Sequence, residues 1–344
     1  MKTADFGFRV PDRLQPVLPL ELRGRRRDDA RLAVLHRADH RIDDAHFCDL
    51  KSYLRPGDVL VVNNSAVIRD RLKGRCAERP VTLILYGHHK GGWHAEVTPA
   101  ERVRRGSVVR IGGGALRAVL LRPSADGMWI VRFEPAEGLY EQLKLHGKHQ
   151  AAGLERLSKR AESYNNVYAT EPGSLEVPSA GLHFTTEILR QIEEMGVEIV
   201  PITLHIGLSE KYRHVSTRNV EDHKVGSEWF RVTRPAAAAI NRARRRGGRI
   251  VAVGTTVIRT LETIAQRQAA ATIRAGEGWT DLYIYPGYRY KIVDVMLTNL
   301  HQPRSSHLML VSAFAGKELT LKVYRELVRK KYRFDLFGDS MLII

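Results

Sequence analysis

The pattern of apolar and polar residues divides the chain into two kinds of sequence. From about residue 66 to residue 140, short apolar runs alternate with turn residues, as in VTLILYG, GGWHAEVTP, SVVRIGGG, LRAVLL and GMWIVRFEP. Short strands at regular spacing are typical of a small antiparallel barrel or sandwich. We therefore predict an inserted β-barrel domain over residues 66–149, carried by a domain built from residues 1–65 and 150–344.

The sequence outside this insert alternates between strand-like and helix-like patterns. A buried-strand run, VLVV, ends at Asn63 and Asn64, and further strands are predicted at residues 197–207, 249–254 and 281–287. Helices with recognisable ends are predicted at residues 184–196, 234–248 and 255–268. Strand–helix alternation predicts an α/β domain with a largely parallel sheet covered by helices.

The composition is that of a globular protein, with 43% hydrophobic and 27% charged residues. No apolar run approaches the roughly 18–20 residues that span a bilayer, and the first residues contain no signal-peptide core. The two cysteines, Cys48 and Cys76, are too few for a disulfide scaffold and form no CxxC pair. We expect a cytoplasmic protein with no membrane partner. Nothing in the sequence indicates an oligomeric state.

The chain is strongly basic: 55 Lys and Arg against 38 Asp and Glu give a formal net charge of +17. Such a balance favours polyanionic partners, above all nucleic acid, although a generally basic composition is the alternative explanation. Four arginines end the helix predicted at residues 234–248 and are candidate phosphate contacts: Arg242, Arg244, Arg245 and Arg246. The alternative is a favourable interaction with the negative end of the helix dipole.

The sharpest local feature is RIVAVGTTVIRTLE, where a strand runs into Gly254, Thr255 and Thr256 and then into a helix. Free N–H groups and the helix dipole attract anions at such a junction, and ligands of parallel sheets bind at that edge. Arg259, one turn later, is placed to contact a carboxylate or phosphate. The alternative is a threonine N-cap with a surface arginine.

Two further loops carry candidate site residues. In VPSAGLHFT, Ser179 and Gly181 permit close approach of backbone and ligand, and His183 points into the turn. In LTNLHQPRSSH, the polar residues Asn299, His301 and Arg304 lead into an apolar, buried run. A dense polar loop entering the core indicates a site. A structural histidine and a solvated loop are the alternatives.

The stretch TLHIGLSEKYRHVSTRNVEDHKVGSEW combines His205, Asp222, His223 and Glu228. These side chains are able to bind a metal, move protons or lie on a wet surface. The stretch contains no HxxxH or HExxH pair and no cysteine, so we predict no metal site. Phosphate-loop and dinucleotide fingerprints are also missing, since RIGGGALRAV lies in the β-rich insert.

Several stretches, in order along the chain, resemble one family. They are RPGDVLVVNNSAVI, PSAGLHFT, TLHIG, DHKVGSE, VAVGTTVIRTLE, TDLYIYPGY, TNLHQPRS, LMLVSAFAG and YRFDLFGDSMLI. This set resembles the S-adenosylmethionine:tRNA ribosyltransferase-isomerases of the queuosine pathway. The resemblance implies an α/β domain with an inserted β-barrel, which agrees with the independent prediction from the strand and helix patterns.

The resemblance also implies a reaction. The ribosyl portion of S-adenosylmethionine would be joined to the aminomethyl group of a deazaguanine base in tRNA, isomerised to an epoxide-bearing ring, while adenine and methionine leave. No cofactor beyond S-adenosylmethionine as substrate, and no metal, would be needed. A sulfonium acidifies the neighbouring carbon, so a base must remove a proton and charge must be stabilised as adenine departs.

Under this resemblance the candidate residues acquire roles. His205, His183 and Glu228 would move protons or orient substrate, and Asp222 with His223 would form an orienting pair. The residues that would hold S-adenosylmethionine are Ser179, Gly181, Gly254, Thr255, Thr256, Arg259, Asn299, His301 and Arg304.

The sequence also departs from the family pattern. Leu208–Tyr212 stands where the family has Gly-Thr-Phe, Gly226 replaces a histidine, and Ser163-Tyr164-Asn165 replaces Arg-Tyr-Gln. A change from histidine to glycine removes a proton carrier. These departures leave two alternatives to the family reaction: use of S-adenosylmethionine on another, small-molecule acceptor, and a non-catalytic RNA-binding protein.

Overall fold

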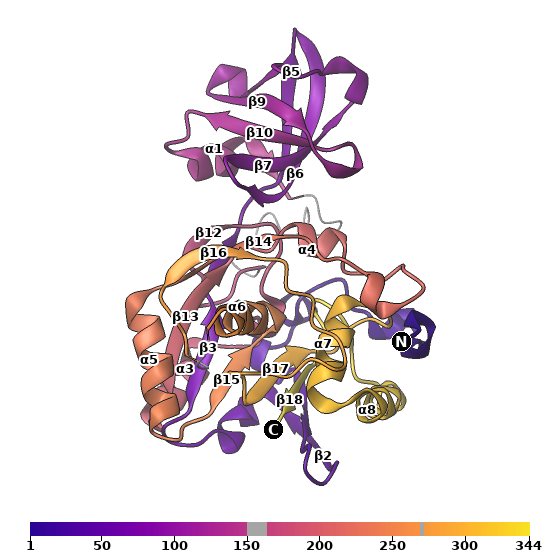
Figure 1. Cartoon of the computed structure of the whole chain (residues 1–344), viewed down its shortest axis with the longest axis vertical. Coiled ribbons are helices and arrows are strands. Elements are labelled where there is room, and N and C mark those ends of the chain that lie inside the picture. Colours follow the sequence, from indigo (N-terminus) through magenta and orange to yellow (C-terminus); the bar gives the residue numbers. More distant parts are fainter. Residues whose placement is uncertain (150–163, 269–271) are drawn as a thin grey trace.

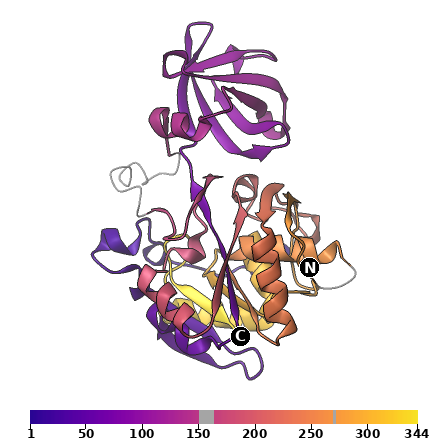
Figure 2. The same cartoon turned by 90° about the vertical axis from the view of Figure 1, so that its left-hand side faces the viewer.

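The computed structural model describes residues 1–149, 164–268 and 272–344, and it separates the chain into a sheet-and-helix body and a barrel joined to one end of it (Figures 1 and 2). The predicted domain boundary at residue 150, and Ser163 of the altered motif, lie outside the described residues. The predicted fold class, an α/β domain with an inserted antiparallel β-barrel, is confirmed.

The body is built on a nine-stranded sheet with the order β16-β14-β13-β3-β15-β17-β18-β1-β2. The strands in that order are Gly276–Thr280, Glu228–Val232, Glu198–Leu204, Val59–Asn63, Ile250–Val253, Val295–Asn299, Ser340–Ile343, Arg31–Leu35 and Ile42–His46. Its centre, β13-β3-β15-β17, is parallel, and β1 is parallel to β18. The remaining pairs, β16–β14, β14–β13, β17–β18 and β1–β2, are antiparallel, so the parallel sheet that the sequence predicts forms the centre of a mixed sheet. A small parallel pair joins β4 (Ser65–Val67) to β12 (Glu171–Ser174).

Helices cover both faces of this sheet because alternate residues of its central strands face opposite cores. Val59 and Val61 pack in one apolar cluster, and Leu60 and Val62 in the other. The helices are α3 (Thr186–Glu194), α4 (Leu208–Lys211), α5 (Arg234–Arg245), α6 (Thr255–Gln266), α7 (Ser306–Ala315) and α8 (Lys317–Arg329). The first core includes residues of α5, α6, α7 and α8, and the second includes residues of α3. Short 3-10 helices lie at Thr3–Phe6, Asp12–Leu14, Leu20–Arg23, Arg27–Asp29, Phe47–Tyr53, Ala100–Arg102, Gly112–Gly114, Ala125–Gly127, Ser179–Gly181 and Val220–Asp222.

The barrel is a closed antiparallel sheet in the order β5-β6-β7-β10-β9-β8, since β8 also pairs with β5. Its strands in that order are Arg71–Cys76, Arg79–His89, Gly92–Thr98, Trp129–Glu134, Leu116–Pro123 and Val108–Ile111. The short β11 (Gly147–Lys148) pairs antiparallel with the start of β5, and α1 (Leu139–His146) precedes β11 in the chain. Inward-facing residues such as Leu72, Leu83 and Leu120 are fully buried.

The barrel meets the body where two glycines approach each other. A Cβ on Gly207 would lie 2.7 Å from the Cα of Gly87 in β6 and 2.8 Å from the carbonyl oxygen of Tyr86, so only glycine permits this contact. The hydroxyl of Tyr212, just after α4, also donates to Asp126 of the barrel. The segment 207–212 is therefore fixed between the two parts of the molecule.

Most predicted elements are found, with one error. β3, β13 and β15 and helices α3, α5 and α6 lie within their predicted ranges. The strand predicted at residues 281–287 is wrong, because the strand is β16, which ends at Thr280. Beyond it, the carbonyl of Leu282 accepts a hydrogen bond from the Arg259 side chain, and Tyr283 and Tyr285 pack as rings against the core. The alternation of apolar residues in 281–287 therefore arises because tyrosine side chains pack on the core, although the backbone of these residues pairs with no strand in the described part of the chain.

Candidate functional site

A cavity of about 210 Å³ opens at the carboxyl edge of the parallel strands β3, β15 and β17. It is lined from five segments: residues 176–180, 206–213, 254–259, 298–307 and 335–336. Ligands of parallel sheets bind at this edge, because loops and helix N-termini converge there. Predicted substrate residues that line the cavity are Ser179, Gly254, Thr255, Thr256, Arg259, Asn299 and His301.

The junction of β15 and α6 forms the floor. Gly254 has φ +88°, a conformation that favours glycine, and no side chain caps α6, so the alternative of a threonine N-cap is wrong. Thr256 Oγ1 accepts a hydrogen bond from Asn63 Nδ2 (3.3 Å) at the end of β3. Asn63 Oδ1 in turn accepts from the backbone N–H of Leu204 (3.0 Å). The ends of three strands are thereby tied together below the cavity.

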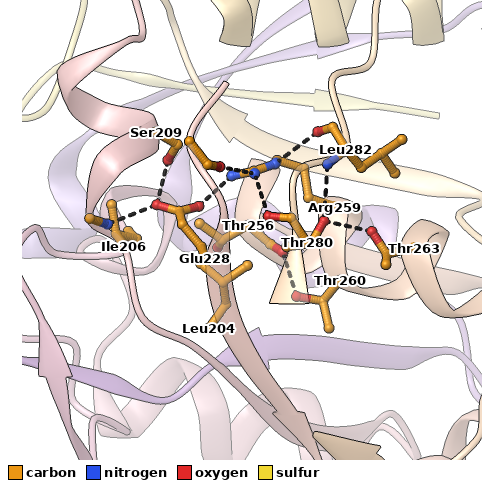
Figure 3. Close-up of polar contacts among 12 residues, drawn as sticks. Leu204, Ile206, Ser209, Glu228, Thr256, Arg259, Thr260, Thr263, Thr280 and Leu282 are labelled. Atoms are coloured by element: carbon orange, nitrogen blue, oxygen red, sulfur yellow. Dashed lines mark hydrogen bonds and ion pairs between the residues drawn. The ribbon is translucent and has the colours of Figure 1, made fainter. Parts of the chain in front are cut away.

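Arg259 is already engaged by protein groups (Figure 3). Its guanidinium donates to the Glu228 carboxylate, to the carbonyl of Leu282 (3.1 Å) and to the carbonyls of Gly226 and Thr280 (both 3.3 Å). Both side chains of the pair are buried. Arg259 therefore shapes the cavity wall. These four bonds use four of its five N–H groups, so the contact to a ligand carboxylate or phosphate that the sequence analysis predicts cannot be bidentate.

Glu228 clamps the loop that separates the cavity from the barrel. Its Oε1 accepts from the backbone N–H of Gly207 (2.7 Å) and from the hydroxyl of Ser209. Gly226 lies directly under this loop, since a Cβ there would be 2.3 Å from Leu208 Cβ and 2.6 Å from its carbonyl carbon. The Arg259–Glu228 pair and Gly226 thus position residues 207–209, and the position of Gly226 has no room for a histidine.

Three carboxyl groups surround one arginine inside the cavity. Arg213 pairs with Glu210 (2.7 Å) and with Asp335 (3.1 Å), and Glu176 accepts a hydrogen bond from the hydroxyl of Tyr164. Burial, followed by the neighbouring Glu210 carboxylate, raises the pKa of Glu176 to about 8. Burial likewise raises the pKa of Glu210. Because Arg259 is matched by Glu228, the cavity has an excess of acidic groups and favours a cationic ligand.

Two histidines complete the wall. His301 Nε2 lies 2.8 Å from Thr298 Oγ1, and the rings of His301 and His307 are 5.0 Å apart. Burial lowers the pKa of His307 to about 3 and that of His301 well below its ordinary value. Both rings are therefore neutral at pH 7, with nitrogens available as hydrogen-bond donors or acceptors. Asn299 donates to the carbonyls of Asp335 (3.3 Å) and Leu336 (3.1 Å), which fixes the loop opposite.

The histidines assigned to proton transfer lie outside the cavity. His205 is stacked between His88 of the barrel and Trp229, at centroid distances of 4.9 and 5.1 Å, and its Nδ1 lies 2.7 Å from Ser65 Oγ. Burial, with His88 nearby, lowers its pKa to about 3. His183 packs against Phe47, and burial lowers its pKa to about 4. His205 therefore lies in the contact between the two domains and His183 in the core, as expected for histidines with a structural role.

Four other candidates also lie away from the cavity. Asp222 is exposed and accepts from Asn219, whereas His223 packs against Tyr283. Gly181 is close to its own chain, because a Cβ there would lie 2.0 Å from the Tyr168 hydroxyl. Arg304 is exposed, with φ +55°, and lines a surface hollow beside residues 2–4.

The predicted phosphate contacts at the end of α5 lie at the opposite edge of the sheet. Gly248, just after the cluster, packs against Gly57, which precedes β3, so that a Cβ would be 1.9 Å from the Gly57 oxygen. Arg242 pairs with Glu198 at the start of β13 (2.7 Å). Arg242, Arg244, Arg245 and Arg246 therefore do not share an edge with the cavity.

The sequence analysis did not single out five cavity residues: Glu176, Glu210, Arg213, His307 and Asp335. Glu210 and Arg213 lie inside the histidine-rich stretch, Asp335 in a family-like motif, and Glu176 next to another. No spacing rule brings residues 176, 210 and 335 together, because only the tertiary fold does so. In residues 1–149, 164–268 and 272–344, no three His, Cys, Asp or Glu side chains form a group that would hold a metal.

No helix within the described ranges is long and apolar enough to cross a membrane.

Comparisons with known proteins agree with the architecture. The family model described as queuosine biosynthesis protein matches residues 3–343. The chain is 44% identical over 352 residues to the S-adenosylmethionine:tRNA ribosyltransferase-isomerase of Moorella thermoacetica and 43% identical over 349 residues to that of Symbiobacterium thermophilum, with both proteins covered completely in each case. The crystal structure of S-adenosylmethionine tRNA ribosyltransferase from Thermotoga maritima is 35% identical, with a TM-score of 0.56 over 99% of this chain and 100% of that one.

Proposed function

Because the chain belongs to the queuosine biosynthesis protein family, we propose that it acts as an S-adenosylmethionine:tRNA ribosyltransferase-isomerase. It transfers and isomerises the ribosyl moiety of S-adenosylmethionine onto the aminomethyl-deazaguanine base of tRNA, giving epoxyqueuosine and releasing adenine and methionine. The observation that carries this proposal is that this chain is 42–44% identical, over its full length, to proteins with that name. These relatives support neither a different acceptor nor a non-catalytic role.

The charge of the cavity supports S-adenosylmethionine as its ligand. The sulfonium is a fixed cation. Glu210 and Asp335 both pair with the single Arg213, and Glu176 adds a third carboxyl group that ionises when a cation binds. In a partly enclosed site such an excess stabilises a cation more strongly than it does in water.

We assign the base that removes the proton beside the sulfonium to Glu176. Its pKa near 8 keeps much of it protonated in the free protein at pH 7. A sulfonium bound nearby favours the carboxylate and lowers that pKa, so the basic form arises when substrate arrives. The neutral rings of His301 and His307 are placed to hydrogen-bond the departing adenine or the ribose.

The proposed reaction changes no oxidation state that requires an external redox agent, so S-adenosylmethionine is its sole small-molecule substrate and no cofactor is included. A tRNA substrate supports a cytoplasmic location, which we include in the proposal.

The test is incubation of the pure protein with S-adenosylmethionine, with and without tRNA bearing the aminomethyl-deazaguanine base, followed by mass spectrometry of adenine and methionine. Release of both in equal amounts, only with that tRNA, is the expected result. Release without tRNA, or release of methylthioadenosine, would contradict the proposal and indicate a different acceptor or a different cleavage.

A further inference from the structure

The end of the barrel that lies away from the sheet body carries an arginine-lined groove. The groove has a volume of about 810 Å³ and lies beside the turn at Cys76 and Ala77. Its charged lining consists of one carboxylate, Glu101, and five arginines: Arg102, Arg104, Arg105, Arg110 and Arg117. In Figure 1 the barrel stands above the body, with β6 and β7 extending toward it. The arginines come from the loop between β7 and β8 and from the paired strands β8 and β9.

Three of these arginines have no carboxylate partner within the described residues, and in two of the three, Arg104 and Arg105, the guanidinium has no polar partner there at all. Arg110 pairs with Glu78 and Arg117 with Glu134, while Arg102 donates to the carbonyl of Pro80. Arg104 and Arg105 are exposed, and neither forms an ion pair within the part of the chain that the structure describes. Unpaired guanidinium groups in a concave surface are suited to phosphate, which they contact in bidentate geometry.

The charge of the chain is concentrated in this region. Residues 66–149 contain 15 Lys and Arg but only eight Asp and Glu, so about a quarter of the chain supplies seven of the seventeen excess positive charges. The cavity, by contrast, has an excess of carboxyl groups and repels phosphate. A polyanionic substrate must therefore be held mainly elsewhere than at the cavity.

The geometry connects the groove to the cavity. β6 runs from Arg79, next to the groove, to Gly87, which packs against Gly207 beside the cavity. Eight residues of strand span about 26 Å at roughly 3.3 Å per residue. A polynucleotide that follows the barrel wall from the cavity reaches the groove after about this distance. The arginines at the end of α5 lie at the opposite sheet edge and offer no such path.

We propose that the barrel groove around Arg104 and Arg105 binds the sugar–phosphate backbone of the acceptor RNA at a distance from the base that is modified. This inference rests on the proposed function for the identity of the RNA. Contacts of this kind position the substrate and do not read its sequence. Tight binding of tRNA, modified or unmodified, therefore depends on the groove, whereas S-adenosylmethionine binding does not.

The test compares two double variants that remove the same charge. Arg104→Ala/Arg105→Ala alters the groove, and Arg245→Ala/Arg246→Ala alters the exposed end of α5 as the matched control. The Kd for full-length tRNA is measured over a series of salt concentrations. We expect the groove variant to weaken binding about tenfold and to reduce the slope of log K against log salt by roughly 2, as loss of two phosphate contacts requires. The control should match the wild type.

A third variant, Arg104→Lys/Arg105→Lys, keeps the charge but loses the bidentate geometry, so it should bind tRNA more tightly than the alanine variant and keep the salt dependence of the wild type. Equal tRNA binding by the groove variant and the wild type would overturn the inference. Equal weakening in the control would also overturn it, because net charge alone would then explain binding. Adenine release by the wild type distinguishes the two proposals. If tRNA binding depends on the groove but no adenine is released, the proposed reaction is wrong and the groove is not. If adenine is released but tRNA binding does not depend on the groove, the groove proposal is wrong and the reaction is not.

Discussion

The cavity and the barrel groove differ in charge, in exposure to solvent and in the elements that form them. The cavity lies at the sheet edge, where Glu176, Glu210 and Asp335 outnumber their cationic partners. The groove lies about one barrel length away and exposes Arg104 and Arg105 without carboxylate partners in the described residues. The net charge of +17 is a sum over the whole chain and hides this difference between the two regions. The comparison teaches that the basic chain separates a site for a small cation from a surface for a polyanion.

The largest effect should come from breaking the frame of the cavity. Arg259→Ala leaves the Glu228 carboxylate buried without its cation, which should lower the free energy of unfolding by about 3–5 kcal/mol. The control is Arg242→Ala, which removes an exposed ion pair with Glu198 and should cost about 0–1 kcal/mol. Denaturant unfolding of both variants checks the difference. Similar small losses would mean that the buried pair does not hold the 207–209 loop.

A smaller loss of stability is expected at Gly226. Gly226→Ala places a Cβ 2.3 Å from that of Leu208, so the loop must shift, at a cost of about 1–3 kcal/mol. Gly226→His, which would recreate the family-like histidine, should be worse because its ring needs still more room. Thermal unfolding measures both. The prediction would be contradicted if the Gly226→His variant were as stable as the wild type and more active. That result would show that the 207–209 loop adapts to the ring and that residue 226 belongs to the site.

The charge of the cavity itself is tested by Glu210→Gln. Loss of one carboxylate should weaken S-adenosylmethionine binding about tenfold, or about 1.4 kcal/mol. Binding of S-adenosylhomocysteine, the neutral thioether, should change little. Calorimetry with both ligands makes the comparison, with Glu193→Gln on the exposed face of α3 as a control. Equal weakening of both ligands would show that Glu210 shapes the cavity without recognising the cation.

The smallest effect expected in the unmodified protein is the change of kcat/KM with pH. A base must be deprotonated to act, so a pKa of about 8 for Glu176 predicts that kcat/KM rises with pH and levels off above about pH 8. Bound sulfonium lowers that pKa, and the inflection in kcat should therefore lie at lower pH. Glu176→Gln should remove this limb along with most of the activity. An unchanged limb in that variant would assign the base elsewhere.

Local patterns in the sequence predicted the fold better than the site. The run VLVV and the junction at Gly254 contain enough information for a strand and a helix, because the alternation and the end signals are local. Residues 281–287 show the limit: the same alternation arises when tyrosines pack on the core while the Arg259 side chain takes the Leu282 carbonyl.

Most of the candidate site could be recognised only from the tertiary structure. Thr256 was found because it follows a predicted strand, and such strand ends meet at one edge. Asn299 and His301 were found because they belong to a dense polar loop that leads into an apolar run. Glu176, Glu210 and Asp335 are far apart in sequence, so nothing local marks them as one acidic group. His205 and His183 were singled out by residue type, whereas their burial against His88, Trp229 and Phe47 depends on the packing of the two domains and the core.

Steady-state kinetics with both substrates varied tests the separation of the two regions most directly. The account predicts that Glu210→Gln raises KM for S-adenosylmethionine and leaves KM for tRNA unchanged. It predicts the reverse for Arg104→Ala/Arg105→Ala, with kcat close to that of the wild type. A groove variant that raises both KM values, or a Glu210 variant that weakens tRNA alone, would contradict the division between a cation-binding cavity and an RNA-binding barrel.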